Sequence, residues 1–170
     1  MSSGDSVRRE TFAALFSQMS PRLFRTALGI LGNQHDAADA LQEAGLKAYR
    51  YFDTLESPEA GAAWLTRIVI NACYDQGKRR SRAIPTGLEP VAESVAAAPG
   101  PEVDLTLVQA LQGLPAEQRT TVVLRFFQDL ALPQIAQVMH VPVGTVKSRL
   151  HTALEKLRVE LHEREQEGVR

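Results

Sequence analysis

A group of polar and basic side chains in the last third of the sequence has the chemistry needed to contact DNA. It lies on one side of a helix that is predicted to begin near Val143, whose other side repeats apolar residues at steps of three and four. Lysine and arginine can contact phosphates or guanine edges, and hydroxyl groups can hydrogen-bond to either. The members of this group are Thr145, Lys147, Ser148, Arg149, His151 and Thr152.

A shorter amphipathic stretch, residues 132–139, precedes this helix and turns Ile135, Val138 and Met139 inward. Pro142 suits the first position of the following helix, where a missing N–H is not needed. Two short helices joined by a tight turn predict a helix-turn-helix, whose second helix enters the major groove. The same periodicity also fits a packed helical hairpin with a solvated polar face, so periodicity alone leaves both interpretations open.

An acidic face is predicted at the start of a helix over residues 36–52. Asp36, Asp39 and Glu43 recur at steps of three and four, with Gln42 beside them. These carboxylates either compensate the positive end of the helix dipole or form a docking face for a basic partner.

A third helix, predicted over residues 62–80, carries the polar groups of Arg67 and Asn71 and ends in a basic cluster. The net charge of the chain is −1, so any contact with DNA is local, and the isolated chain should bind duplex DNA weakly. The basic cluster consists of Lys78, Arg79, Arg80 and Arg82.

The sequence indicates no catalytic chemistry. It contains no nucleophile–base arrangement, phosphate-binding loop or dinucleotide motif. His151 and Glu155 could share a metal ion, but no third ligand is evident, and the single Cys73 forms no internal disulfide. We expect no enzyme activity, no cofactor and no metal. Because no apolar run approaches the ~20 residues of a membrane span, and the first residues lack the apolar core of a signal peptide, we expect a cytoplasmic protein without membrane contact.

The helical periodicities predict an all-α protein in two parts. Four prolines between Ala83 and Pro101 indicate a flexible, acidic linker, and we expect the halves to fold independently. Pro21 interrupts the first helix, and the charged tail is expected to fray beyond Leu161. The predicted domains are residues 1–82 and 104–170, with the linker at 83–103. The helices not yet mentioned are expected over 11–31, over 104–112 and from 114 to 127.

Motifs in both halves resemble the extracytoplasmic-function (ECF) family of bacterial RNA polymerase sigma factors. The stretch 141–150 is similar to the recognition helix of that family, within a match to its σ4 domain from Leu111 to Leu157. The first half is similar to its σ2 domain in order and spacing. That similarity rests on Leu31-Gly32-Asn33, Asp36-Ala37-Ala38-Asp39, Gln42-Glu43, Leu46-Lys47-Ala48-Tyr49-Arg50 and Trp64-Leu65-Thr66-Arg67-Ile68.

The resemblance implies a dissociable subunit that gives the polymerase core its choice of promoter. The helix-turn-helix would read the −35 element through the six residues named above. Residues 1–82 would hold the melted −10 element through Arg67, Asn71, Lys78, Arg79 and Arg80. Asp36, Asp39, Gln42 and Glu43 would dock on the clamp helices of the β′ subunit. The implied partners are polymerase core, including its β subunit, promoter DNA and an anti-sigma factor.

Three departures from the family pattern stand out. Gly45 replaces a bulky aromatic residue inside the second helix, at a cost of ~1 kcal/mol in helix stability. Ala131 stands where a serine commonly caps the first helix of the motif, at a similar cost of ~1 kcal/mol. His151 and Thr152 replace a pair that often includes arginine, which leaves the base preference there open.

Two other functions remain compatible with parts of the sequence. One is a dimeric helix-turn-helix regulator that binds duplex promoters by itself, which leaves the acidic helix and Asn71 unexplained. The other is a protein-interaction module that has lost promoter reading.

Overall fold

The computed structural model describes residues 3–83 and 103–169 of the 170-residue chain, and these residues form seven α-helices and two short 3₁₀ helices. The all-α fold predicted from the sequence is confirmed in this part of the chain. Most of the linker predicted at 83–103 lies outside the described residues. No helix among them is long and apolar enough to cross a membrane.

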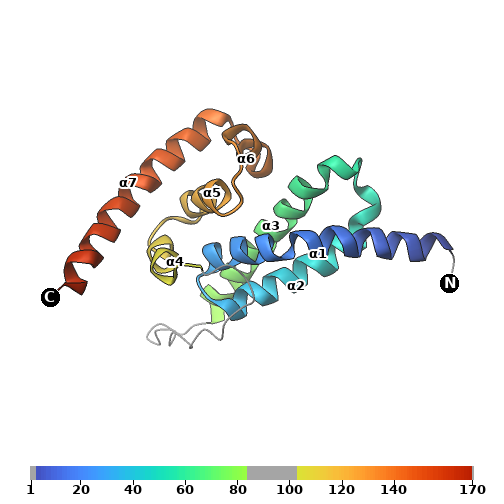
Figure 1. Cartoon of the computed structure of the whole chain (residues 1–170), viewed down its shortest axis with the longest axis horizontal. Helices are drawn as coiled ribbons and strands as arrows, with labels where there is room; N and C mark the ends of the chain where they lie inside the picture. Colours follow the sequence, from blue (N-terminus) through green and yellow to red (C-terminus); the bar gives the residue numbers. More distant parts are fainter. Residues whose placement is uncertain (1–2, 84–102, 170) are drawn as a thin grey trace.

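The N-terminal half consists of α1 (Ser3–Leu31), α2 (Gln34–Tyr51) and α3 (Gly61–Ala83), with the 3₁₀ helices η1 (Phe52–Thr54) and η2 (Pro58–Ala60) before α3 (Figure 1). α1 continues through Pro21, where the sequence predicts an interruption. The inner side of α2 is made of small residues that are fully buried, which lets α1 and α3 pack close to it. These residues are Ala37, Ala40, Ala44 and Ala48.

Gly45 has a packing reason that the sequence does not reveal. A Cβ atom at this position would lie 2.9 Å from Cζ of Phe16, a residue of α1. The ring of Phe16 therefore occupies the space into which a side chain at position 45 would extend. Phe16 in turn stacks on Phe12, with ring centroids 5.7 Å apart.

The C-terminal half consists of α4 (Leu105–Gln112), α5 (Ala116–Phe126), α6 (Leu132–Met139) and α7 (Val143–Gly168). α6 and α7 form the helix-turn-helix, and His140 in the turn adopts a left-handed conformation with φ of 53°. Val146, Ala153 and Leu157 of α7 are buried, as their spacing predicts. α7 continues past Leu161, where fraying is expected, and Arg164 Nη1 donates a hydrogen bond to Gln109 Oε1 of α4 at 3.2 Å.

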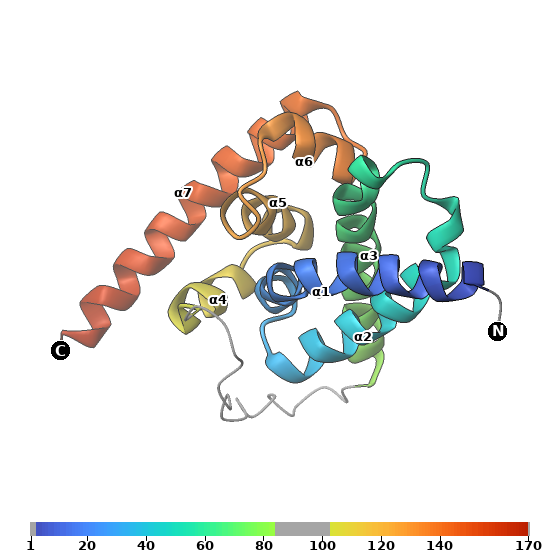
Figure 2. The same ribbon diagram turned by 45° about the vertical axis from the view of Figure 1, so that its right-hand side comes forward.

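The two halves contact each other, although the sequence predicts separate units. α1 packs on α4 and α5, and α3 packs on α6 (Figure 2). A Cβ atom on Gly29 would lie 2.8 Å from Cγ2 of Val123 and 2.9 Å from Cε2 of Phe127, so α1 and the α5 segment approach closely there. This contact places the helix-turn-helix against α3.

Buried polar groups also cross between the halves. Gln128 follows α5 and is 5% exposed. Its Nε2 donates to Thr26 Oγ1 at 2.8 Å, and its Oε1 accepts from Thr66 Oγ1 at 3.3 Å. Arg119 Nη1 donates to the carbonyl oxygen of Ile30, at the end of α1, at 2.7 Å. Because buried polar groups require partners, these contacts favour one specific docking of the halves.

Candidate nucleic-acid and polymerase interface

The exposed part of the first turns of α7 carries most of the residues predicted to read the −35 element. Lys147, Ser148, His151 and Thr152 are exposed, and Thr145 is partly exposed. They face away from the buried residues that hold α7 on α5 and α6. Their hydroxyl, imidazole and ammonium groups therefore lie on the solvent-facing side of α7.

Arg149 occupies a different environment from its neighbours. Its Nη2 atom lies 3.1 Å from Oε2 of Glu117 on α5, and its side chain is only 21% exposed. In this docked arrangement the guanidinium is held by a carboxylate of its own half.

Of the residues on α3 that are predicted to hold the −10 element, some are exposed to solvent and others already contact another part of the protein. Asn71, Lys78 and Arg79 are exposed. Arg67 instead donates to the carbonyl oxygens of Gln137 and Val138 at 3.0 and 3.4 Å, near the C-terminal end of α6. A cation is favoured there because the last carbonyl groups of a helix have no partner within it.

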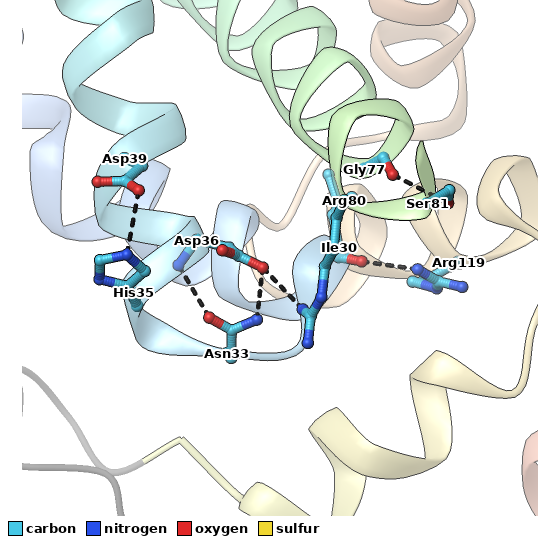
Figure 3. Close-up of polar contacts among 9 residues, drawn as sticks. All are labelled: Ile30, Asn33, His35, Asp36, Asp39, Gly77, Arg80, Ser81 and Arg119. Carbon is cyan, nitrogen blue, oxygen red and sulfur yellow. Dashed lines mark hydrogen bonds and ion pairs between the residues drawn. The ribbon is translucent and has the colours of Figure 1, made fainter. Parts of the chain in front are cut away.

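The acidic residues of α2 also occupy unequal positions. Asp39 and Gln42 are exposed, Glu43 is partly exposed, and Asp36 is largely covered. Glu43 pairs with Arg79. Asp36 pairs with Arg80, and Figure 3 shows this second pair. The structure thus brings two residues predicted for core docking into direct contact with two predicted for DNA binding.

Comparison with known proteins identifies the two halves. Residues 15–83 match the family model of sigma-70 region 2, and residues 110–159 match that of sigma-70 region 4. The chain is 37% identical over 153 residues to the ECF RNA polymerase sigma factor SigM of Mycobacterium tuberculosis, covering 88% of this chain and 76% of SigM. It is 29% identical to SigW of Bacillus subtilis, covering 91% of each chain. The chain belongs to the ECF family of RNA polymerase sigma factors.

Two solved structures share this fold. The sigma factor RpoE of Bartonella quintana, in complex with the anti-sigma factor NepR, matches with a TM-score of 0.72 and 25% identity. The match covers 88% of this chain and 98% of RpoE. CnrH, in complex with the cytosolic domain of CnrY, matches with a TM-score of 0.66 and 21% identity, which shows the shared fold.

Two polar residues that join the halves of this sigma factor were missed as functional candidates. Arg119 donates to four carbonyl oxygens, three of them between Leu111 and Leu114, and burial lowers the pKa of its guanidinium. Gln128 carries the buried contacts between the halves. Arg119 falls within the matched σ4 motif, but its contacts depend on tertiary packing, and Gln128 lies in a loop with no periodic signal.

Proposed function

We propose that this sigma factor binds RNA polymerase core through α2 and reads a promoter with two separate surfaces. The −35 element is bound by the outer side of α7, and the melted −10 element is held by α3. The domain boundaries that accompany this assignment are residues 1–82 for core docking and the −10 element, 83–103 for the linker, and 104–170 for the −35 element.

The observation that carries the proposal is that the exposed sides of α2 and α7 differ in chemistry, with Asp39 exposed on α2 and Lys147 exposed on α7. The outer side of α2 combines exposed Asp39 and Gln42 with Leu46, which is 67% exposed one turn farther along. A carboxylate and an amide beside an exposed apolar side chain suit a basic protein surface. An acidic face of this kind repels DNA, so it favours a protein partner on the clamp helices of the β′ subunit.

The −35 assignment rests on the exposed side of α7. Lys147 can contact phosphate or a guanine edge, and Ser148, His151 and Thr152 can hydrogen-bond to bases or phosphates. Thr145 lies in the first turn, where backbone N–H groups favour a phosphate. Arg149 joins this set when its ion pair with Glu117 exchanges for DNA.

The −10 assignment rests on α3. Asn71 offers an amide for a flipped-out base, and Lys78, Arg79 and Arg80 supply the cations that single-stranded DNA requires. Arg67 becomes available when it leaves the carbonyl groups of α6. Capture of unstacked bases shifts the equilibrium from duplex towards the open complex, so this role needs no catalytic group.

An anti-sigma factor completes the set of proposed partners. The solved structure of the sigma factor RpoE contains the anti-sigma factor NepR. A cationic regulator bound to the acidic face of α2 would compete directly with polymerase core, which gives it a physical route to inhibition.

Run-off transcription with polymerase core on genomic fragments, with mapped start sites, tests the function. Specific transcripts should appear only when the chain is present. Co-purification with core separates a sigma factor from a helix-turn-helix regulator that acts alone, and transcription separates it from a module that only binds protein. The absence of both core binding and start-site selection would contradict the proposal.

Charge reversal tests the docking face. Asp39→Lys combined with Glu43→Lys should weaken core binding without unfolding the chain, because exposed charges contribute little to stability. Glu163→Lys combined with Glu167→Lys is the matched control, since it reverses two exposed acids at the same spacing on α7. Equal core affinity for both double variants would assign core docking to another surface.

A further inference from the structure

Asp36 lies at a joint between two helices, whereas Asp39 points outward from α2. The Oδ2 atom of Asp36 accepts hydrogen bonds from Asn33 Nδ2 and from Arg80 Nη1, both at 2.7 Å. Its side chain is 15% exposed, compared with 48% for Asp39. Figure 3 shows Arg80 extending from α3 to this carboxylate while Asp39 lies apart beside His35. A carboxylate covered in this way presents little surface to a protein partner.

The ion pair of Asp36 with Arg80 suits the dipoles of the two helices that it connects. Asn33 caps α2, its Oδ1 accepts the N–H of Asp36 at 2.8 Å, and Asp36 is the third residue of the helix. Arg80 lies in the last turn of α3. A negative charge is favoured at the start of a helix and a positive charge at its end, so the pair is stabilised by both dipoles as well as by its own attraction.

Packing alone does not fix the end of α3. Within residues 61–82 of α3, whose burial is described, Cys73 is the last buried residue, and none of residues 77–82 is buried. The ion pairs that tie this segment to α2 are those of Arg79 with Glu43 and of Arg80 with Asp36. The pair with Asp36 is the better covered, because the Arg79 and Glu43 side chains are 56% and 44% exposed.

We propose that Asp36 is a positioning residue for the basic end of α3, acting on promoter opening through Arg80 and not by contacting polymerase core. The inference rests on the proposed role of α3 in holding the −10 element. A guanidinium carries five N–H donors, and Asp36 engages one nitrogen, so the others remain for a phosphate. The Arg80 side chain is 34% exposed, which leaves part of it accessible.

The size of the effect follows from the ordering of a long side chain. Arg80 held by Asp36 has already lost much of its rotamer freedom, whereas a released side chain would lose it on binding DNA. Immobilising one such side chain corresponds to about a two- to tenfold change in affinity. We expect Asp36→Ala to reduce open-complex formation by about this factor when core is saturating.

The experiment is a double-mutant cycle on the full chain with Asp36→Ala, Arg80→Ala and their combination. Open-complex formation is measured on the promoter mapped by run-off transcription, and core affinity is measured separately. Asp36→Ala should reduce open-complex formation and leave the affinity for core unchanged. When Arg80 is already alanine, Asp36→Ala should cause no further reduction. Asp36→Glu keeps a carboxylate at a position that favours glutamate, and it should restore opening.

A second readout needs no polymerase. Amide hydrogen exchange in residues 77–83 of the free chain should become faster in Asp36→Ala and in Arg80→Ala. Asp39→Ala is the matched control: it removes the same group one turn along α2, and it should weaken core binding while exchange at the end of α3 stays as in the unsubstituted chain.

Several outcomes would overturn the positioning role. They are reduced core affinity in Asp36→Ala, a gain in DNA binding on releasing Arg80, additive effects of the two substitutions, or unchanged exchange in residues 77–83. Absence of transcription by the unsubstituted chain would contradict the proposed function itself. The hydrogen-exchange result would still decide whether Asp36 orders the end of α3.

Discussion

Arg149 and Asn71 have different surroundings in the free sigma factor. Arg149 is largely covered and paired with Glu117, whereas Asn71 is exposed on the other half of the chain. Their substitutions should therefore affect separate steps of initiation. Arg149→Ala should weaken engagement of the duplex −35 element by about 1–3 kcal/mol if the guanidinium makes a bidentate base contact. Asn71→Ala should instead impair opening.

Transcription from duplex and pre-opened versions of one promoter measures this difference. Pre-opening should relieve part of the Asn71→Ala defect and leave most of the Arg149→Ala defect. Arg158→Ala is the control, because it removes the same charge from an exposed position farther along α7. Identical responses of Arg149→Ala and Asn71→Ala to pre-opening would contradict the two-surface assignment.

Cys73 behaves as part of the core. It is 1% exposed, and burial raises the pKa of its thiol from 9.0 to about 12. Because the thiolate is the reactive form, alkylation at pH 8 should be slow in the native chain and fast in urea. The raised pKa also means that the thiol favours the folded state below pH 9, and that this contribution is lost as the pH rises towards 12. Rapid native alkylation, followed by mass spectrometry, would contradict this environment.

At the scale of the elements, α6 begins with half of a capping arrangement. Gln134 Oε1 accepts the N–H of Ala131 at 2.8 Å, but the alanine has no side-chain oxygen to return the bond to the first turn. Ala131 is exposed, so a larger side chain fits there without displacing the core.

We expect Ala131→Thr to stabilise the protein relative to Ala131→Val by ~1 kcal/mol, since the two side chains have similar shapes and only threonine caps. For a cooperative unit of this size, the difference corresponds to a melting temperature higher by about 2–4 °C. Thermal unfolding followed by circular dichroism measures it. Equal melting temperatures would mean that the start of α6 is not open to capping.

At the scale of the whole molecule, the docked halves cannot bind both promoter elements at once. The −35 and −10 positions are about 25 base pairs apart, which is about 85 Å at 3.4 Å per base pair. A compact chain of this length has a radius of gyration of about 16 Å. In the docked form, Arg67 of α3 contacts α6, so separation of the halves would also release this side chain.

Gly29 offers a way to separate the halves without touching either promoter-binding surface. Gly29→Ala would place a methyl group within 3 Å of Val123 and Phe127, and should shift the chain towards an extended form. Gly77→Ala is the matched control, because it replaces another helical glycine, one whose Cβ would meet nothing within 4 Å. Small-angle X-ray scattering should show a larger radius of gyration for Gly29→Ala only. An unchanged radius for both variants would mean that the contact adapts to the methyl group.

The sequence alone determined the helices, the helix-turn-helix and the family. These features follow from periodicity and from local motifs, such as Pro142 before α7, whose effects act within a few residues. The candidate DNA-binding and docking residues could also be predicted from the sequence, because polar residues that lie opposite the apolar stripe of an amphipathic helix are expected to be exposed. Their roles remain predictions.

Only the tertiary structure decided how these residues are engaged in the free chain. The close approach at Gly29 and the buried contacts of Gln128 join residues about one hundred positions apart, and no local pattern records such a pairing. The same is true of Asp36 and Arg80, which are 44 residues apart. The spacing on α2 places Asp36 on the same face as Asp39. In the structure, the end of α3 covers the carboxylate of Asp36 and leaves that of Asp39 in solvent. The difference arises because burial depends on which helix packs alongside.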